Sequence, residues 1–351
     1  MKKKHYLFYI SQNYSYAILR PLQDVILAQG GEIFWFLEGN EVDSKFLRDD
    51  EECLPSIDAI RSWKPDAVFA PSNLIPNFIP GLKVAVFHGF AAGKLNRRGR
   101  LDHFEIRGCF DLYCTQGPNT SAPFEALAAK HGYFSVKETG WPMLDPLFRP
   151  IENNPYVDDS DPRKTLLMCS TFSRNLSCAP HLYSLMKRLA DKGKWRILVQ
   201  FHPKMPVEIV NNYKAINSKN LTFIETDNVI PLLQSADVML CDTSSILEIF
   251  LLLRRPVVTF RNQTNAAHLL NVDTEDEVES AIELALSYPP SLMAEIERYC
   301  QQLHPYQDGK SSERVLAATN TLIDSKEPRP NKPLNLLRMF KLRKKLGYWK
   351  C

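Results

Sequence analysis

The chain has 351 residues, of which 44% are hydrophobic and 24% are charged, and this composition excludes an intrinsically disordered chain. The length predicts two folded domains rather than one. Residues 326–351 contain nine Lys or Arg and one Glu, a net charge of +8. The remaining 34 basic and 39 acidic residues give residues 1–325 a net charge of −5. An acidic body argues against nucleic acid as a partner.

Eight cysteines are spread along the chain without the Cys-x-x-Cys pairs of a structural zinc site or the dense spacing of a disulfide scaffold. We therefore expect reduced thiols, no bound metal, no cofactor and a cytoplasmic location. Residues 1–11 begin with lysines, but the apolar run that follows is too short for a signal peptide and is expected to form a strand. No segment approaches the roughly 20 apolar residues that cross a bilayer.

Short β-branched or aromatic runs alternate with longer amphipathic segments, a rhythm that predicts parallel sheets covered by helices on both faces. The expected strands of the first half are residues 5–10, 32–37, 67–70, 83–87 and 112–115. Those of the second half are residues 165–169, 196–201, 221–224, 238–241 and 256–260. Helical patterns dominate from residue 274 to residue 323.

These patterns predict an N-terminal domain over residues 1–148 and a C-terminal domain over residues 164–325. The Pro-, Asp- and Asn-rich residues 149–163 are expected to link them, and residues 326–351 form a basic tail. Two Rossmann-like, doubly wound α/β domains facing a cleft form the arrangement called GT-B. Ligands of such sheets sit beyond the carboxyl ends of the strands, with the first domain expected on the acceptor side and the second on the nucleotide side.

The turn after the expected strand 238–241 is rich in hydroxyl groups and opens an apolar helix. It contains Asp242, Thr243, Ser244 and Ser245, and Glu248 follows one turn into the helix. Backbone N–H groups, hydroxyls and the helix dipole favour an anion at such a turn, although Ser and Thr are also ordinary helix caps. A carboxylate among apolar residues is costly to bury without a partner, and ribose hydroxyls would supply one for Glu248.

Two histidines follow expected strands, one in each domain. His88 and Gly89 come directly after strand 83–87, and His202 comes after strand 196–201, before Pro203. A histidine at a strand end is well placed for acid–base work near neutral pH, whereas a turn histidine satisfied by backbone is the structural alternative. The occurrence of such a pair in both domains favours a functional role.

Two further loops combine hydroxyl groups with an arginine. Residues 170–174 end in Arg174, and residues 308–314 include Asp308, Ser311, Ser312 and Arg314. Each could meet an anion, and together with the turn at Asp242 they suggest a diphosphate ligand. The sequence has neither a metal-binding His-Glu-x-x-His pattern nor a Cys/His cluster with ligand spacing.

Several segments, taken in this order, resemble the CDP-glycerol glycerophosphotransferase family, the teichoic-acid primase and polymerase group with a GT-B fold. They are VFHGFAAGK, DLYCTQGP, TGWPMLDPLF, LLMCSTFSRN, VQFHPK, VMLCDTSSILEIFLLLRRPVVTF and DGKSSERV, and they cover roughly residues 83–316. The resemblance implies an enzyme that moves a polyol phosphate, glycerol phosphate first, from a CDP-linked donor to a hydroxyl of a lipid-linked or glycan acceptor of the cell envelope. CMP is the implied leaving group.

The resemblance also implies roles for residues. His88 maps to the base that acts on the acceptor hydroxyl, and His202 maps to a contact of the donor phosphates. The CDP site maps to Arg174, Asp242, Thr243, Ser244, Ser245, Glu248, Asp308, Ser311, Ser312 and Arg314, with Gly89, Lys94 and Asp145 as further site residues. The family often has Pro-Arg-Asn-Asp where this chain has Pro-Met-Leu-Asp ending at Asp145, so CDP-ribitol and other CDP-linked donors stay open.

The tail from residue 333 to residue 351 places leucines and Phe340 among lysines and arginines. This composition predicts a basic amphipathic helix on an anionic membrane surface, with Tyr348 and Trp349 near the headgroups, at the inner face of the cell membrane. A mobile solvated tail is the alternative.

Two rival functions share the predicted fold. A UDP-sugar glycosyltransferase or a UDP-N-acetylglucosamine 2-epimerase also has an Asp-Ser turn followed by a Glu and a basic residue before Pro-Val, as in Asp242, Ser244, Glu248 and Arg255 here. A catalytically silent GT-B module that scaffolds an envelope assembly complex is the third possibility. The nucleotide released from CDP-linked or UDP-linked donors would separate the three.

Overall fold

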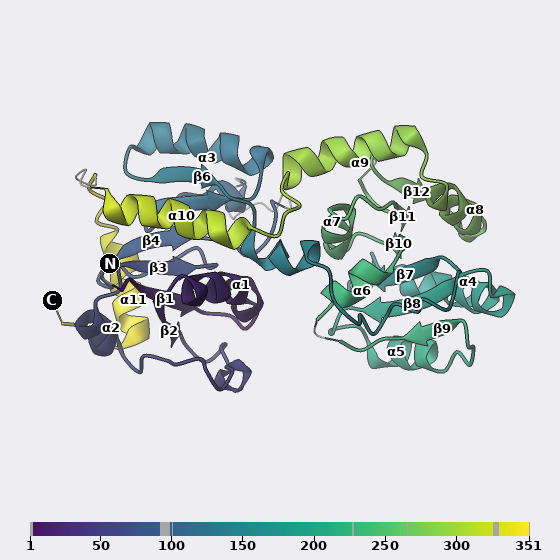
Figure 1. Ribbon diagram of the computed structural model, residues 1–351, viewed down its shortest axis with the longest axis horizontal. Helices are drawn as coiled ribbons and strands as arrows, with labels where there is room; N and C mark the ends of the chain where they lie inside the picture. The colour runs from purple at the N-terminus through teal and green to yellow at the C-terminus, as the bar shows by residue number, and fades with distance from the viewer. Residues whose placement is uncertain are drawn as a thin grey trace. The chain divides into compact units, whose positions relative to one another are not determined.

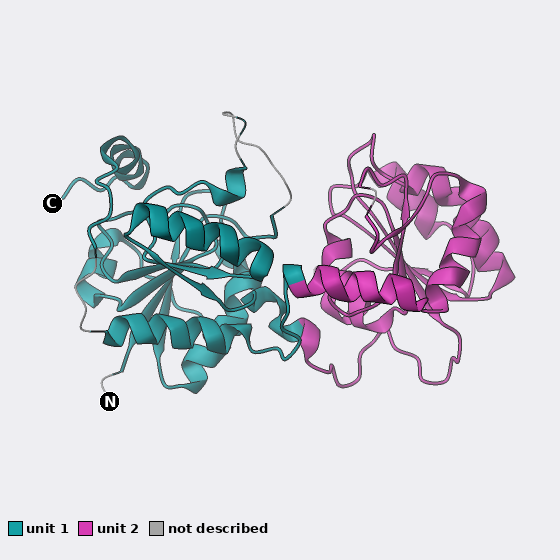
Figure 2. Cartoon of the chain, turned by 90° about the horizontal axis from the view of Figure 1, so that it is seen from above, with its two compact units in different colours: residues 1–146, 302–351 teal, residues 147–301 magenta. Residues whose placement is uncertain are grey.

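The computed structural model describes residues 3–91, 99, 101–226, 228–264, 266–325 and 330–350. The chain divides into two compact units (Figure 2). Unit 1 contains Met1–Pro146 and Gln302–Cys351, and unit 2 contains Leu147–Gln301. Each unit has one parallel sheet, labelled in Figure 1. The prediction of two doubly wound parallel-sheet units is confirmed.

The described part of unit 1 has a six-stranded parallel sheet in the order β2-β1-β3-β4-β5-β6. Its strands are β1 (His5–Ile10), β2 (Glu32–Leu37), β3 (Ala67–Ala70), β4 (Leu82–Ala85), β5 (Leu112–Thr115) and β6 (Ser135–Glu138). The central strands are buried along their whole length, because helices cover both faces of the sheet.

Five α-helices belong to the described part of unit 1: α1 (Ser15–Ala28), α2 (Ile57–Trp63), α3 (Pro118–His131), α10 (Ser311–Asp324) and α11 (Leu336–Leu346). Helices α1 and α10 pack against each other on one face of the sheet. On the other face, one core cluster joins Ile60 of α2, Phe124 of α3 and Leu342 of α11 to Val68 of β3 and Tyr113 of β5. Short 3-10 turns lie at Ser44–Phe46, Asp102–Phe104 and Pro142–Phe148.

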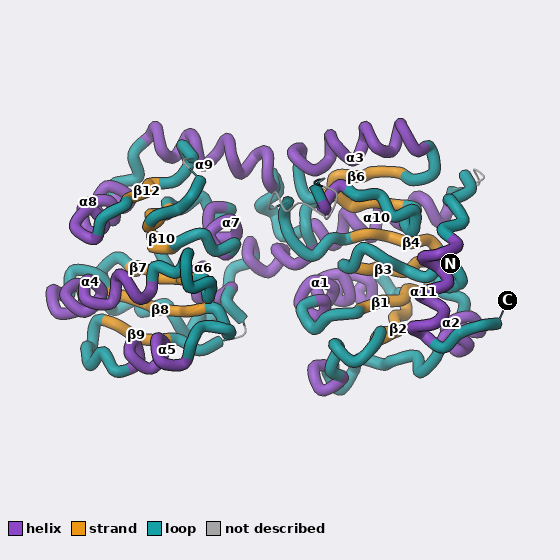
Figure 3. The backbone as a smooth tube through the Cα atoms, turned by 180° about the vertical axis from the view of Figure 1, so that it is seen from behind, coloured by secondary structure: helices purple, strands orange, loops and turns teal. Residues whose placement is uncertain are grey.

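The described part of unit 2 has a six-stranded parallel sheet in the order β12-β11-β10-β7-β8-β9. Its strands are β7 (Thr165–Ser170), β8 (Arg196–Phe201), β9 (Leu221–Phe223), β10 (Val238–Cys241), β11 (Val257–Phe260) and β12 (Leu270–Val272). The first strand, β7, lies in the middle with β8 and β10 beside it (Figure 3). The strand order reverses between β7 and β10, and ligands of such sheets bind at that point.

Unit 2 also has helices on both faces of its sheet. They are α4 (Ala179–Lys192), α5 (Val207–Lys214), α6 (Ile230–Ser235), α7 (Ile246–Leu251), α8 (Glu275–Leu286) and α9 (Pro290–Leu303). One core cluster joins Leu185 of α4, Tyr213 of α5 and Ile282 of α8 to Val199 of β8 and Leu240 of β10. Helices α6 and α7 contact β7 and β10.

The predicted extent of the second domain, residues 164–325, is wrong at its C-terminal end. Helix α10 belongs to unit 1, where Asn320 accepts hydrogen bonds from Lys4 (3.2 Å) and from the Tyr6 hydroxyl (2.7 Å). Val315 and Leu316 of α10 are fully buried. The apolar side of α10 therefore completes the core of the first unit.

Residues 149–163 form no helix or strand and are part of unit 2. Asn154 donates to the Pro231 carbonyl at 2.8 Å, and Arg163 donates to Asn220 at 2.7 Å and to the Gly193 carbonyl at 3.1 Å. The predicted linker is thus fastened along the surface of unit 2 through its own side chains.

The basic tail does form a helix, α11, but one side of it is packed against unit 1. Met339, Leu342 and Tyr348 are buried, and the Tyr348 ring stacks on Phe78 at 5.2 Å. The expectation that Tyr348 lies among lipid headgroups is therefore wrong, because its ring belongs to the core of unit 1. Within the residues that the structure describes, no helix is long and apolar enough to span a membrane.

Candidate functional site

The hydroxyl groups of the turn after β10 are available to a ligand. Thr243 and Ser245 are exposed and Ser244 is half-buried. Ser245 is the residue before α7, yet its side chain does not cap that helix. Within the described part of the chain, none of the three hydroxyls makes a hydrogen bond, so all three can donate to a ligand.

Asp242, by contrast, is fully buried and its carboxylate binds protein groups. It accepts hydrogen bonds from the Ser170 hydroxyl at 2.6 Å and from the backbone N–H groups of Thr171 and Cys178 at 3.0 Å. Cys178 is the residue that opens α4. The carboxylate therefore ties the end of β10 to the end of β7 and to the start of α4. This geometry makes Asp242 a positioning residue of the turn, which differs from the ligand contact that the sequence suggested.

Asn262, which the sequence analysis did not select, supports the same turn from the next strand. Its side-chain amide donates to the Asp242 carbonyl at 3.0 Å, and its backbone N–H donates to Asn271 at 2.9 Å. The signal was available, because Asn262 follows β11 at the same edge of the sheet where Asp242 follows β10.

The loop after β7 places an unpaired arginine beside a cavity. Arg174 is exposed and has no ion pair with the described residues. With Phe172, Ser177, Met205 and Glu208 it lines a cavity of about 260 Å³. Since β7 and β10 are neighbours, this cavity and the hydroxyl-rich turn border the same edge of the unit 2 sheet.

His202 lies at the end of β8 with its ring held in one orientation. The ring contacts Phe172 with a centroid distance of 4.5 Å. Its Nδ1 is 3.0 Å from the backbone N–H of Lys204. A backbone N–H can only donate, so Nδ1 is the acceptor and the proton of the neutral ring lies on Nε2. Burial and the positive charge of Lys204 lower the pKa of His202, which favours this neutral form.

Glu248 lies on α7 in a half-buried group of three side chains. Its carboxylate accepts a hydrogen bond from the Tyr299 hydroxyl at 3.3 Å, and the Tyr299 ring stacks on His268 at 3.8 Å. Burial raises the pKa of Glu248, partly offset by the bond from Tyr299. Burial also lowers the pKa of His268. Tyr299, rather than a ligand, is thus the partner of Glu248 in this structure.

In unit 1, His88 is exposed and follows β4. The residue directly before it in the sequence has a strained backbone. Phe87 has a φ of +58°, in the left-handed region that bulky residues rarely adopt. The Nδ1 of His88 is 3.0 Å from the Pro71 carbonyl, and its ring lies 5.7 Å from that of Tyr14. A carbonyl can only accept, so in the neutral ring Nδ1 carries the proton and Nε2 carries the lone pair. His88 is therefore set up as a proton acceptor.

Two residues missed by the sequence analysis border His88. Gln116, at the end of β5, is fully buried and donates to the Gly89 carbonyl at 2.9 Å, which fixes the His88–Gly89 turn. His103 stacks on Phe87 at 5.1 Å, and burial, followed by the neighbouring His88, lowers its pKa to about 4. Lys94, predicted on the same loop, lies outside the described residues.

Asp145 is a buried helix cap in unit 1. Its two carboxylate oxygens accept from the backbone N–H groups of Ser311 at 2.7 Å and Ser312 at 2.8 Å, the first residues of α10. Gly140 allows this approach, because its φ is +78° and a Cβ there would lie 2.4 Å from the Ser311 hydroxyl oxygen. Both serines are buried. They serve the packing of α10, and the buried Ser312 hydroxyl lacks a partner among the described residues.

The segment 308–314 is likewise engaged within unit 1. Arg314 pairs with Asp308 and lies 3.9 Å over the ring of Tyr306. The Tyr306 hydroxyl in turn donates to Glu138 at 3.2 Å. The expectation that this segment shares a domain with Asp242 and His202 is therefore wrong.

The predicted site residues thus form two groups, one on each unit. Unit 2 brings together, at the ends of β7, β8 and β10, Arg174, His202 and the turn of Asp242, Thr243, Ser244 and Ser245. Unit 1 holds His88, Gly89, Asp145 and the segment 308–314. Among the residues described, no three His, Cys, Asp or Glu side chains are grouped as a metal site requires.

No protein-family model matches this chain, and no curated protein matches it by sequence. Solved structures match its fold. A protein of Listeria monocytogenes described as a UDP-N-acetylglucosamine 2-epimerase has a TM-score of 0.65 at 14% identity, over 95% of this chain and 100% of its own. The wall teichoic acid polymerase TagF has a TM-score of 0.62 at 15% identity, over 92% of this chain and 89% of its own.

MnaA of S. aureus, solved with UDP, has a TM-score of 0.60 at 16% identity over 93% of this chain and 100% of its own. These structures and the present chain share two parallel-sheet units over almost their whole length. The chain has the GT-B fold. At these identities the likeness extends to the fold alone, so the function of this GT-B protein has to be argued from its own residues.

Proposed function

We propose that this GT-B protein is a transferase that moves a polyol phosphate, most simply glycerol phosphate, from a CDP-linked donor to an acceptor hydroxyl and releases CMP. The acceptor is a lipid-linked or glycan component of the cell envelope. The motif resemblance to the glycerophosphotransferase family and the fold shared with TagF both support this assignment.

The observation that carries the proposal is the opposite protonation of the two histidines. Pro71 fixes the proton of His88 on Nδ1 and leaves Nε2 as an acceptor. Lys204 fixes the proton of His202 on Nε2 and makes that nitrogen a donor. Transfer of a phosphoryl group to a hydroxyl needs both, a base for the hydroxyl and a donor to the phosphate oxygens.

In the proposed reaction the acceptor oxygen attacks the β-phosphorus of the donor. A new P–O bond forms to the acceptor, and the bond between the β-phosphorus and the bridging oxygen breaks. The electron pair of the broken bond leaves with CMP, and the hydroxyl proton passes to Nε2 of His88. Nε2–H of His202 donates to a diphosphate oxygen and stabilises the charge that develops there.

Unit 2 supplies further groups for a diphosphate. Arg174 is free of carboxylate partners within the described chain and can bind phosphate oxygens in a bidentate manner. The hydroxyls of Thr243, Ser244 and Ser245 add three donors. Asp242, whose carboxylate is buried, holds the turn that presents them.

One observation favours a second candidate, a UDP-sugar enzyme. MnaA of the same fold was solved with UDP, and a UDP-N-acetylglucosamine 2-epimerase superposes over the whole of its own length. Glu248 lies one turn after Ser244 and carries a raised pKa because of burial, so it could act as an acid. The nucleotide that the protein binds and releases decides between the two candidates.

The test incubates the full chain with CDP-glycerol, CDP-ribitol or UDP-N-acetylglucosamine, with and without a lipid-linked glycan acceptor, and measures released CMP and UDP. We expect acceptor-dependent CMP release. His88→Ala should slow transfer about 100-fold or more while CDP-glycerol still binds. His202→Ala should weaken both donor binding and transfer.

His131→Ala is the matched control, because His131 is an exposed histidine of α3 outside the candidate site. CMP release at an unchanged rate by His88→Ala would exclude His88 as the base. Release of UDP without CMP would support the second candidate, and binding of neither nucleotide would overturn both.

A further inference from the structure

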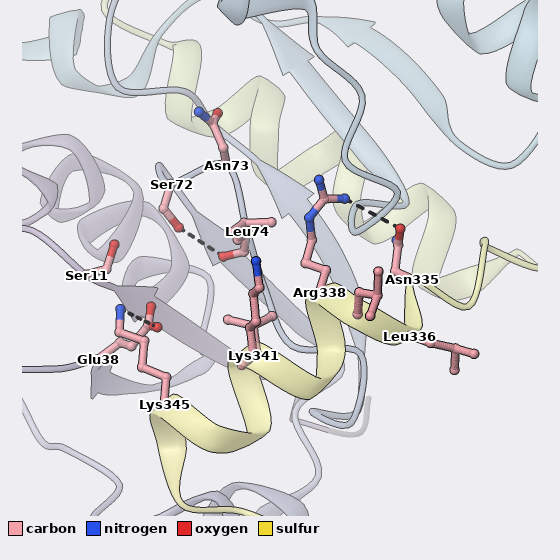
Figure 4. Close-up of a pocket in the computed structure, with 12 residues that line it drawn as sticks. Ser11, Glu38, Ser72, Asn73, Leu74, Asn335, Leu336, Arg338, Lys341 and Lys345 are labelled. Carbon is pink, nitrogen blue, oxygen red and sulfur yellow. Dashed lines mark hydrogen bonds and ion pairs between the residues drawn. The ribbon is translucent and has the colours of Figure 1, made fainter. Parts of the chain in front are cut away.

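A cavity of unit 1 lies beside the C-terminal helix and has a volume of about 960 Å³. Figure 4 shows its two walls. One wall is formed by residues just after three parallel strands: Ser11 after β1, Glu38 after β2, and Ser72 to Leu74 after β3. Helix α11 forms the other wall and directs Arg338, Lys341 and Lys345 towards these loops.

The cavity lies at the edge of the sheet where proteins of this fold class bind ligands. The chain runs from β1 outward to β2 and then returns to the opposite side of β1 with β3. The strand order therefore reverses between β1 and β3, and the crevice beyond their carboxyl ends is where open α/β sheets bind ligands. Ser11 and Ser72 stand at those two ends.

The helical wall is fixed in place. Lys332 pairs with Asp111 at 2.7 Å, and Asn335 donates to the Arg107 carbonyl at 3.0 Å. Met339 accepts a hydrogen bond from the Asn77 backbone on its sulfur at 3.4 Å. Tyr348 is anchored against Phe78 after the helix ends. Contacts therefore fasten the chain before α11, within α11 and after it. The cavity is thus already formed in unit 1.

The wall residues give the cavity a positive charge. Lys345 pairs with Glu38 at 2.8 Å, which neutralises that carboxylate. Within the described chain, Arg338 donates only to the Arg107 carbonyl and to Asn335, and Lys341 has no partner. Three cations against one carboxylate leave a charge of +2 around the cavity. An anion is the complementary ligand.

The rim of the cavity is apolar. Leu336 and Leu337 line it and are nevertheless 73% and 83% exposed, and Leu74 and Leu342 add apolar surface inside. These neighbouring leucines offer an apolar surface beside the charged part of the cavity. A ligand that fits both parts carries a negative group next to a hydrocarbon chain.

The cavity also adjoins the segment that orients the histidine assigned as the base. Pro71, whose carbonyl orients His88, directly precedes the cavity residue Ser72. A phosphate held by Lys341 and Arg338 would thus be anchored close to the segment that positions His88. This places the cavity on the acceptor side of the proposed reaction.

We propose that this cavity binds a lipid-borne phosphate, with the phosphate between Lys341, Arg338 and the Ser72 loop and the hydrocarbon chain along Leu336 and Leu337. The ligand is the lipid carrier of the acceptor, and this part of the inference rests on the proposed function. Helix α11 then has two roles, as a wall of the site and as the side from which the lipid enters.

The experiment measures sedimentation of the full chain with vesicles of phosphatidylcholine alone, with added phosphatidylglycerol, or with an added polyprenyl phosphate. We expect binding to depend on the anionic lipids, which carry a phosphate without a neutralising choline, and to be strongest with the polyprenyl phosphate. Lys341→Gln should weaken it about five-fold, the effect of one well-placed lysine at a membrane surface. Lys344→Gln is the matched control, since Lys344 is exposed on the same helix, has no partner among the described residues and does not line the cavity.

An equal loss of binding in both variants would overturn the proposal, because the helix would then act only as a diffuse basic surface. Complete competition by soluble glycerol phosphate would also overturn it, because the ligand would be a free phosphate. Leu337→Asp should abolish vesicle binding and leave urea unfolding unchanged at this exposed position. Retained vesicle binding by Leu337→Asp would show that the apolar rim does not contact the lipid.

This outcome is separable from that of the proposed function. Vesicle binding is measured without any nucleotide, so Lys341-dependent binding can be found even if CMP is never released. If CMP is released, Lys341→Gln should raise the KM for the lipid acceptor and leave CDP-glycerol affinity unchanged. A change in CDP-glycerol affinity instead would contradict an acceptor site.

Discussion

Replacing Asp242 with alanine separates the two roles that sequence and structure give to this residue. If Asp242 contacts the nucleotide, its removal should abolish binding and leave the fold stable. If it positions the turn, its removal should destabilise unit 2. The carboxylate accepts from the buried Cys178 N–H at 3.0 Å, from Thr171 N–H at 3.0 Å and from Ser170 at 2.6 Å.

The cost follows from the groups that lose their acceptor. The Ser170 hydroxyl keeps a second partner, Ser177, at 2.8 Å, so the cost comes mainly from two backbone N–H groups. Each unsatisfied buried N–H costs about 1–3 kcal/mol, and Thr171 is only half-buried, so Asp242→Ala should cost about 2–4 kcal/mol. Asp242→Asn keeps an acceptor oxygen and should cost about 1 kcal/mol, the loss of charge assistance.

Amide hydrogen exchange followed by mass spectrometry measures this loss directly. Amides of β7 and β10 that exchange only when unit 2 unfolds should lose protection about 30- to 700-fold in Asp242→Ala. Asp191→Ala removes an exposed carboxylate of α4 that has no partner in the described chain, and it should leave protection unchanged. Unchanged protection in Asp242→Ala together with lost nucleotide binding would refute the positioning role.

Two further predictions concern unit 1. Asp145→Ala removes the acceptor of two buried N–H groups, of Ser311 and Ser312, and should destabilise the protein by about 2–4 kcal/mol, measured by urea unfolding, with a smaller loss for Asp145→Asn. The folded pKa of His103, about 4, lies below the ordinary value of about 6.5, so only the unfolded chain takes up this proton between those values. Stability should therefore be full above about pH 6.5 and fall by about 2 kcal/mol at about pH 5. His103→Phe, which keeps the stacking on Phe87, should flatten this part of the profile, and an unchanged profile would show that His103 does not titrate as described.

The fold could be predicted because buried parallel strands leave an unambiguous pattern. Runs such as residues 67–70 and 238–241 are apolar throughout, since both faces of the sheet are covered. The sequence did not predict β6 and β12, each of which lies at an edge of its sheet. Ser135–Glu138 alternates polar and partly buried residues, and Leu270–Val272 has only three residues. Pairing with one neighbour stabilises them, and a local pattern cannot reveal that pairing.

For a related reason, local sequence patterns could not show which of the two units contains helix α10. An amphipathic helix shows that one side is buried, but not which sheet buries it. The bonds of Asn320 to Lys4 and Tyr6 join residues more than 300 positions apart. Asp145 is likewise 166 and 167 positions from its partners Ser311 and Ser312, so its role as a helix cap could only be seen in the structure.

The two histidines show where prediction of the site ends. Their positions after β4 and β8 follow from strand patterns, and this much the sequence predicted. Their protonation depends on one backbone group each, a carbonyl at Pro71 and an N–H at Lys204. The sequence does not determine which backbone group, a carbonyl or an N–H, the fold brings to each ring. A strained Phe87 and a buried Gln116 that holds the Gly89 carbonyl fix the turn of His88. The chemistry assigned to each histidine is therefore a property of the folded backbone. For His88, changing Gln116 to leucine would test this without touching the ring.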